Sequence, residues 1–408
     1  MNSIDRRTLL KLATAAALTG CGHIPSVASG PRVVVAGAGI IGASIAYHLS
    51  VAGAAVTVID EVGPASHASR GTFAWINATW AKQPRHYHSF SQQGVANWHY
   101  LQKQLEIPVR WGGSLEWLGT KAEQQKLLGL IEEQKAWGEP AQMLAGPEIR
   151  ELEPQLVFNS DLAAYSANDG AVDPVIATQK LLSAAQQFGA RVEYPSKLTG
   201  VSTAGGRLVS VQTSTGTIKT DKLVLATGAA SEVAKRFAGV DIPQRSTPGV
   251  IVVTRPMPRV INRIIAAPGA HMHQRDDGRL VLGEQSGAPD TQAHADRLAN
   301  RPNEFPARIF AEQHADRMFA IAQQFVPAIK NAELEDAYIA WRPLPVDGHP
   351  VLGVSPVQQD TYLAIMHSGV SLAPIVGQLA AHELVQGDTV DTLSPYRPDR
   401  QFATVKRY

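Results

Sequence analysis

The residues best suited to chemistry are three glycines and one acid near the start of the chain. Gly37, Gly39 and Gly42 follow the apolar run 33–36, and Asp60 closes a second apolar run. In a strand–loop–helix unit the first glycine permits a tight turn, the second lets the backbone approach a pyrophosphate, and the third lets the helix pack against the strand. The helix would offer N–H groups to phosphate, and the acid would accept from ribose hydroxyls. This spacing predicts a dinucleotide site, whereas an ordinary glycine-rich turn would leave Asp60 unexplained.

Three distant segments accompany this loop. The run 224–230 is a second apolar strand that ends in glycine, and the stretch 342–353 reads R-P-x-x-x-D-G-x-P-x-x-G. The third segment, 366–374, places Gly369 at the start of a helix. In this order they resemble the FAD-dependent D-amino-acid oxidase superfamily, which includes glycine oxidase, sarcosine oxidase and D-amino-acid dehydrogenase. The resemblance extends from about Arg32 to Gln386.

The resemblance implies FAD binding and an oxidoreductase that oxidises the C–N bond of an amino acid or secondary amine. Hydride would pass to flavin N5, and the resulting imine would hydrolyse. N–H groups of a helix that opens at 369–372 would lie at the flavin pyrimidine edge and stabilise the reduced ring, unless this is a plain helix start capped by Ser371. Ser66, Ser69 and Arg70 would hold the pyrophosphate or the flavin, although Arg70 could instead be a solvated loop cation. Leu198 would contact the adenine side of the cofactor through its backbone only. The cofactor-binding residues expected are Gly37, Gly39, Ile40, Ile41, Gly42, Asp60, Ser66, Ser69, Arg70, Leu198, Thr227, Gly228, Gly369, Val370, Ser371 and Leu372.

Arg342 is the expected substrate-binding residue. Tyr338 and Arg342 lie on one strand at a spacing that points both side chains to the same face. A guanidinium can bind a carboxylate through two parallel hydrogen bonds, and the resemblance places this arginine where the family binds the amino-acid carboxylate. The alternative is a structural ion pair with a nearby acid such as Asp336.

Three histidines are further candidates for the substrate side of the site. His271 and His273 share a face of one strand and would line the pocket. An H-x-H pair can bind metal, but no carboxylate or cysteine pattern completes a site, so no metal is expected. His367 stands where some relatives carry another arginine, which departs from the pattern for a simple small amino acid. The catalytic residues predicted are Arg342, Tyr338, His273 and His367.

The order of elements predicts an α/β fold with two discontinuous domains. One is a Rossmann-like FAD-binding domain, with a central parallel sheet and a β-meander, formed by residues 31–80, 145–245 and 330–395. The other is an α+β substrate domain with a largely antiparallel sheet, formed by residues 81–144 and 246–329. Residues 1–30 would be an export signal and tether.

That leader resembles a twin-arginine export signal ending in a lipobox. Arg6-Arg7 precede an apolar run too short to span a bilayer, and Cys21, the only cysteine, would be lipidated. We therefore expect a lipid anchor on the periplasmic side of a bacterial membrane, or a cytoplasmic protein if the leader is not a signal. A net charge of +1 and the lack of a basic run argue against nucleic acid as a partner.

The cofactor is expected to be bound without a covalent link. No cysteine is available within the fold for a thioether. His67 could form a histidyl bond, but an exposed loop histidine is common. Two other function classes stay open: an FAD-dependent 2-hydroxy-acid oxidoreductase, and a non-catalytic FAD-binding partner of an electron-transfer complex. The sequence leaves open the substrate, its chirality, and whether oxygen or a quinone accepts the electrons.

Overall fold

The computed structural model describes residues 30–245, 248–284 and 302–405. The predicted leader, with Arg6-Arg7 and Cys21, lies outside the described residues. Across the described ranges, no helix combines the length and the apolar character that a membrane span requires.

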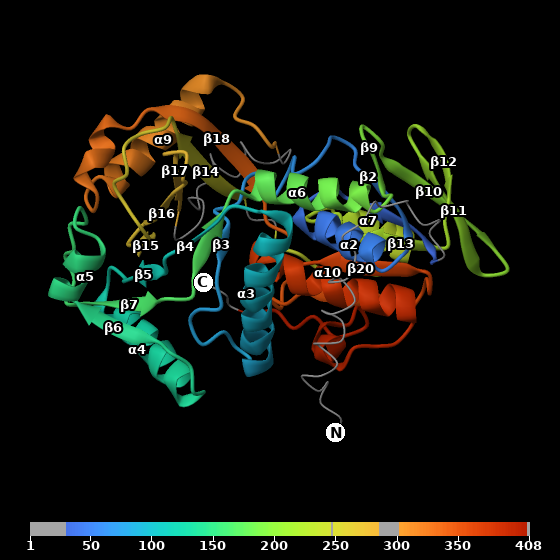
Figure 1. Ribbon diagram of the computed structural model, residues 1–408, viewed down its shortest axis with the longest axis horizontal. Helices are drawn as coiled ribbons and strands as arrows, with labels where there is room; N and C mark the ends of the chain where they lie inside the picture. The colour runs from blue at the N-terminus through green and yellow to red at the C-terminus, as the bar shows by residue number, and fades with distance from the viewer. Residues whose placement is uncertain (1–29, 246–247, 285–301, 406–408) are drawn as a thin grey trace, which may run out of the picture.

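The first sheet is central to the half of the molecule that carries the glycine loop (Figure 1). Its neighbouring strands are parallel except for the outermost pair, β19 and β20, which is antiparallel. Across the sheet the order is β19 (Val351–Val354), β20 (Thr361–Ile365), β13 (Lys222–Leu225), β1 (Arg32–Ala36), β2 (Ala55–Ile59) and β9 (Arg191–Glu193).

Both faces of this sheet are covered, which explains why its strands are continuous apolar runs. On β1, Val33 and Val35 pack into one core cluster, whereas Val34 and Ala36 pack into another on the opposite face. One face is covered by α2 (Ile40–Val51), α10 (Gly369–Gln386), α6 (Pro174–Gln187) and α3 (Arg85–Leu105). On the other face lie α7 (Ser231–Ala238) and the predicted β-meander, formed by β10 (Leu198–Ala204), β11 (Arg207–Thr213) and β12 (Gly216–Lys219).

The second large sheet is mixed and largely antiparallel, with one parallel pair between β15 and β5. Its order is β18 (Leu334–Trp341), β14 (Pro248–Thr254), β17 (Leu280–Gly283), β16 (Ala270–Gln274), β15 (Ile264–Ala267), β5 (Ser114–Glu116), β7 (Leu162–Ser166) and β6 (Gln142–Ala145). Around it lie α4 (Lys121–Ala136), α5 (Gly146–Leu152), α9 (Arg308–Ala322) and the 3-10 turn Pro327–Asn331. The remaining elements are β3 (Trp75–Ile76), β8 (Gly170–Val172), β4 (Val109–Trp111) and the 3-10 turn Asp391–Tyr396.

This arrangement confirms the predicted fold class, a Rossmann-like α/β unit with a meander plus an α+β unit. Two strands fall on the other side of the predicted domain boundaries. β7 pairs with β5, and β18 pairs with β14 along most of its length, so both belong to the mixed sheet although they were assigned to the cofactor domain. Local patterns identify a strand but not its partner, because pairing is decided by long-range packing.

Candidate active site

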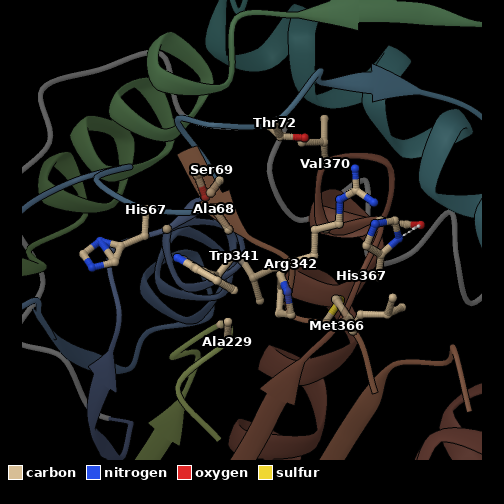
Figure 2. A pocket seen from close by; sticks show the side chains of 18 of the residues that line it. His67, Ala68, Ser69, Thr72, Ala229, Trp341, Arg342, Met366, His367 and Val370 are labelled. Atoms are coloured by element: carbon tan, nitrogen blue, oxygen red, sulfur yellow. Dashed lines mark hydrogen bonds between the residues drawn. The ribbon is translucent and has the colours of Figure 1, made fainter. Parts of the chain in front are cut away.

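One cavity of about 2260 Å³ connects the glycine loop with the inner face of the mixed sheet. It is lined at one end by Gly37 and Asp60 and at the other by His271 and Arg342. Figure 2 shows Arg342 and His367 gathered on one side of the view, with His67 and Ser69 on the other. Typical ligand pockets measure about 300–1,000 Å³. The cavity therefore has room for a dinucleotide together with a small substrate.

The glycine loop has the close packing that its sequence predicted. Gly37 has a φ of +112°, a backbone conformation that residues with a side chain rarely adopt. A Cβ on Gly42 would overlap the carbonyl oxygen of Gly37. Gly39 is the extended residue before α2, and the N–H of Ile40 donates to Ser69 Oγ at 2.9 Å. Gly37, Gly39, Ile40 and Ile41 line the cavity, so the loop and the first turn of α2 present backbone to it.

Asp60 holds the loop itself, a role that the sequence did not predict. Its carboxylate accepts from the N–H groups of Ala38 at 2.8 Å, Val62 at 2.9 Å and Gly63 at 2.8 Å. A carboxylate has about four acceptor positions. Three are thus occupied by backbone, and one is left for a ribose hydroxyl. The predicted contact of Asp60 with both ribose hydroxyls stays a prediction, and only one acceptor position of the carboxylate remains for it.

Asp60→Asn is expected to weaken FAD binding about 30-fold and to lower stability by about 2 kcal/mol, because an amide cannot accept at both ends and backbone N–H groups lose charged acceptors. Flavin retention on gel filtration and the thermal midpoint measure the two effects. Glu132→Gln is the matched control, since this exposed glutamate on α4 pairs with Lys135 at 2.9 Å outside the cavity and surface pairs contribute little. Equal losses in both variants would contradict this role of Asp60.

A second set of backbone groups lines the cavity where β13 ends. Gly228 has a φ of +58°, and a Cβ built on it meets nothing within 4 Å. Thr227 Oγ1 is buried without a hydrogen-bond partner among the described residues. Buried hydroxyls are normally paired, so this one is available to a polar ligand. Leu198, at the start of β10, also lines the cavity.

The N-terminus of α10 forms another part of the wall. Ser368 precedes the helix with a φ of 58° and gives no side-chain cap, and Gly369, Val370 and Ser371 line the cavity. First-turn N–H groups have no acceptor within a helix. Ser371 Oγ is already engaged, accepting from Asn77 N at 3.0 Å and donating to Trp75 O at 3.1 Å.

Leu372 was predicted to bind the cofactor, and the structure contradicts this. Its side chain is fully buried in the core beneath the helix. Its N–H donates to Ser368 O at 3.1 Å, so it has an acceptor within the chain. The helical periodicity turns the fourth residue of the helix away from the cavity.

Taken together, these groups fit a flavin dinucleotide. The donor set consists of backbone N–H groups at two helix N-termini, which suit phosphate and an electron-rich ring edge. The unpaired hydroxyl of Thr227 adds a further polar contact. Ser66 and Ser69 line the same wall, although Ser66 Oγ donates to Gly63 O at 2.5 Å.

Arg70 and Tyr338 bind each other instead of serving the cavity. An Nη of Arg70 donates to Tyr338 Oη at 3.2 Å and lies 3.7 Å from Asp336, and its guanidinium lies over the tyrosine ring. Neither residue lines the cavity as the structure describes it. The predicted cofactor role of Arg70 and catalytic role of Tyr338 stay predictions, which this pairing does not support. The Asp336 pair considered for Arg342 belongs to Arg70.

Arg342 lies on the cavity wall just after β18, and its binding of a substrate carboxylate stays a prediction. A Cβ on Gly249, the neighbouring residue on β14, would lie 3.3 Å from Arg342 Nε, so the glycine leaves space for the guanidinium. Burial, with a smaller contribution from Arg342, lowers the pKa of His271 to about 4. His271 is thus neutral at ordinary pH and adds no positive charge beside the arginine.

His273 was predicted to be catalytic, and the structure places it behind the cavity wall. Its ring packs edge-on against Phe73 at a centroid distance of 4.8 Å, and Nε2 pairs with the Phe73 carbonyl at 3.0 Å. Phe73 lines the cavity and covers His273, so of the two histidines only His271 lines the cavity. His367 does line the cavity, with Nδ1 3.3 Å from Ser368 Oγ.

Several cavity residues were missed by the sequence analysis, including Thr72, Phe73, Trp80 and Glu116. Thr72 and Phe73 come from the loop after Arg70, Trp80 from the segment between β3 and α3, and Glu116 from β5. The one local signal was Gly71. A Cβ at this position would overlap the Cβ of Ala340, so the loop can pack closely on β18 only with a glycine here.

Acid should destabilise the folded chain through its buried histidines. Burial lowers the pKa of His48 to about 4, whereas an exposed histidine in the unfolded chain titrates near 6.5. The unfolded state therefore binds more protons between these values, and the stability present above pH 6.5 is lost as pH falls toward 4. The carboxyls of Glu116 and Asp169 act in the opposite sense, because burial raises their pKa values to about 7 and about 6.

A single-site comparison separates these contributions. The free energy of unfolding of wild type relative to His48→Gln should fall by about 3 kcal/mol between pH 7 and pH 4. Urea titrations at four pH values measure this difference. A difference that does not change with pH would show that His48 titrates normally in the folded chain.

Comparisons with known proteins agree with this geometry. Residues 32–383 match the model of the family described as FAD dependent oxidoreductase, DAO. A glycine oxidase from Bacillus licheniformis is 25% identical over 383 residues, covering 91% of this chain and 97% of the relative. The anaerobic glycerol-3-phosphate dehydrogenase subunit A1 of Haloferax volcanii is 26% identical over 331 residues, and the match spans 77% of this chain but only 54% of that relative.

The fold is shared with solved structures. That of glycine oxidase from Geobacillus kaustophilus matches with a TM-score of 0.81 at 22% identity, covering 91% of this chain and 99% of that one. At this identity the likeness shows the fold.

Proposed function

Because this chain belongs to the DAO family of FAD-dependent oxidoreductases, we propose that it oxidises the C–N bond of an amino acid or secondary amine to an imine that hydrolyses. The observation that carries this proposal is Arg342 on the wall of a cavity shared with the FAD-binding loop. The similarity to a protein named glycine oxidase supports it.

Arg342 would bind the substrate carboxylate and fix the orientation of its α-carbon. A guanidinium forms two parallel hydrogen bonds to a carboxylate, which sets direction as well as distance. Gly249 leaves the space for that guanidinium, and the neutral ring of His271 lies near it. Most of the rate enhancement would come from holding the reacting atoms in place, and little side-chain acid–base chemistry would be needed.

The cofactor site would be formed by the loop at Gly37, the strand end at Thr227 and the N-terminus of α10. When bound, FAD supplies the acceptor for the hydride that leaves the substrate. The N–H groups of Gly369 and Val370 would place a partial positive charge where negative charge collects. We propose that the cofactor is held without a covalent bond, and acid precipitation tests this: a yellow supernatant is expected, and a yellow pellet would indicate a bond, for which His67 is the candidate.

Oxidation of a 2-hydroxy compound is the second candidate. One relative is named a glycerol-3-phosphate dehydrogenase subunit, which favours oxidation of an alcohol. Product analysis with matched pairs of amino and hydroxy acids separates the two. We expect a carbonyl product with release of ammonia or a primary amine. A carbonyl product from the hydroxy acid alone would support the second candidate, and no product from either would support a non-catalytic role in an electron-transfer complex.

The electron acceptor and the location are further parts of the proposal. We propose that oxygen or a quinone reoxidises the flavin, and rates of reoxidation with each distinguish an oxidase from a dehydrogenase. We also propose a lipid anchor at Cys21 on the periplasmic side of a bacterial membrane, supported by Arg6-Arg7 and the short apolar run after them. Fractionation of wild type and Cys21→Ser tests the anchor: wild type should be in the membrane fraction and the variant should not.

A further inference from the structure

A row of residues crosses the inner face of the mixed sheet from Tyr338, on the strand that leads to Arg342, to a distant carboxyl. Residues paired directly across strands point to the same face. From β18 to β5 the row consists of Tyr338, Ile251, Gly283, His271, Ala266 and Glu116. Ile251, Gly283, His271 and Glu116 all line the cavity. The cavity therefore continues along the sheet well past Arg342.

Glu116 is an acid on the cavity wall that pairs with an indole rather than with a cation. One carboxyl oxygen accepts from the indole Nε1 of Trp80 at 2.6 Å. Within the described ranges, no lysine, arginine or histidine forms an ion pair with it. Lys82, which acts electrostatically on Asp169, donates through Nζ to Asn77, at 2.7 Å to Oδ1 and 3.2 Å to O. Burial, together with the neighbouring carboxyl of Asp169, raises the pKa of Glu116 to about 7.

The separation between His271, on which Arg342 acts, and Glu116 indicates the length of a ligand that would reach both Arg342 and Glu116. β16 and β5 are separated by β15 alone. His271 and Glu116 are therefore about 10 Å apart along the sheet, given a strand spacing of about 4.8 Å. Arg342 acts on His271 electrostatically and lies at the near end. A molecule with a carboxylate at one end and a charged group several bonds away matches this spacing.

We propose that Glu116 and Trp80 form a subsite for the positively charged end of the substrate whose carboxylate Arg342 binds. The proposal rests on the proposed function only in taking Arg342 as the carboxylate site. A buried carboxylate is stabilised by an opposite charge within hydrogen-bonding distance, and an indole face attracts a guanidinium or ammonium group. The substrate class is therefore an amino acid with a long cationic side chain, of which arginine is an example.

Arginine and citrulline test this directly, since they have the same length and differ in the charge of the terminal group. Both enantiomers of each would be titrated calorimetrically at pH 8 into holoenzyme reduced beforehand with dithionite, which prevents turnover. Arginine of one enantiomer should bind about 10- to 100-fold more tightly than its citrulline counterpart. In Glu116→Gln, which keeps the acceptor for Trp80, that ratio should fall to about one.

Glu132→Gln is the matched control, because this glutamate lies exposed on α4 and pairs with Lys135. It should keep the wild-type ratio. Equal affinities for arginine and citrulline in wild type, or a preference that survives Glu116→Gln, would overturn the subsite. In a separate experiment, the loss of absorbance of the oxidised flavin on mixing with amino acids is measured. If arginine binding depends on Glu116 but no amine reduces the flavin, the proposed function fails and the subsite stands.

Discussion

Replacement of Arg342 by leucine is expected to raise the KM for a carboxylate-bearing amine by about 100- to 1,000-fold, since about 3–4 kcal/mol of charge-assisted binding is removed. Leucine keeps an apolar side chain near Gly249 and removes both hydrogen bonds. Because Arg342 lies in the cavity away from the glycine loop, the flavin content should not change. Steady-state kinetics and the ratio of flavin to protein absorbance measure the two quantities.

Arg70→Leu is the matched control for the loss of an arginine. Arg70 is 48% exposed and binds Tyr338 and Asp336 instead of the cavity, so its KM effect should stay within about threefold, as for other surface pairs. A substrate analogue without the carboxylate should lose little in Arg342→Leu. Loss of FAD from that variant, or unchanged turnover, would contradict the role of Arg342.

A single methyl group at Gly42 is expected to abolish FAD binding. The Cβ of Gly42→Ala would overlap the carbonyl oxygen of Gly37 and lie 3.1 Å from its carbon, so only backbone can yield. The expected cost is about 3 kcal/mol or more of stability, at the upper end for overpacking. Displacement of the loop would also remove its N–H groups from the cofactor. Flavin content after purification and the thermal midpoint report the outcome.

Gly129 supplies the control for this substitution. It also lies in a helix, α4, but a Cβ there meets nothing within 4 Å. Gly129→Ala should leave the flavin content unchanged and raise stability by about 0.5–1 kcal/mol, because alanine favours the helix. If Gly42→Ala retained a full complement of FAD, the close packing of the loop would not be required for binding.

The cofactor end of the site could be predicted from the sequence because its determinants are local. The turn at Gly37, the helix start at Gly39 and the acid at Asp60 follow one another within a single strand–loop–helix–strand unit, and backbone geometry fixes their relation. The three strands of the meander are local for the same reason, since short turns join them.

The substrate end was predicted less well because it depends on long-range packing. The alternation of side chains along a strand predicts the face to which His273 points. It does not predict that Phe73, from a distant loop, covers the histidine ring. Likewise, Tyr338 shares the face of Arg342, yet Arg70 binds its hydroxyl. Glu116 reaches the cavity only because β5 pairs with β15, a contact that no local pattern encodes.

Anaerobic reduction of the flavin tests the central claim most directly. The purified holoenzyme would be mixed without oxygen with a panel of amino acids and N-methylated amines, and in parallel with the corresponding 2-hydroxy acids. If the chain oxidises a C–N bond, at least one amine will bleach the flavin absorbance, and Arg342→Leu will slow the bleaching by a carboxylate-bearing substrate. Bleaching by a hydroxy acid alone, or by no compound in either panel, would contradict the claim.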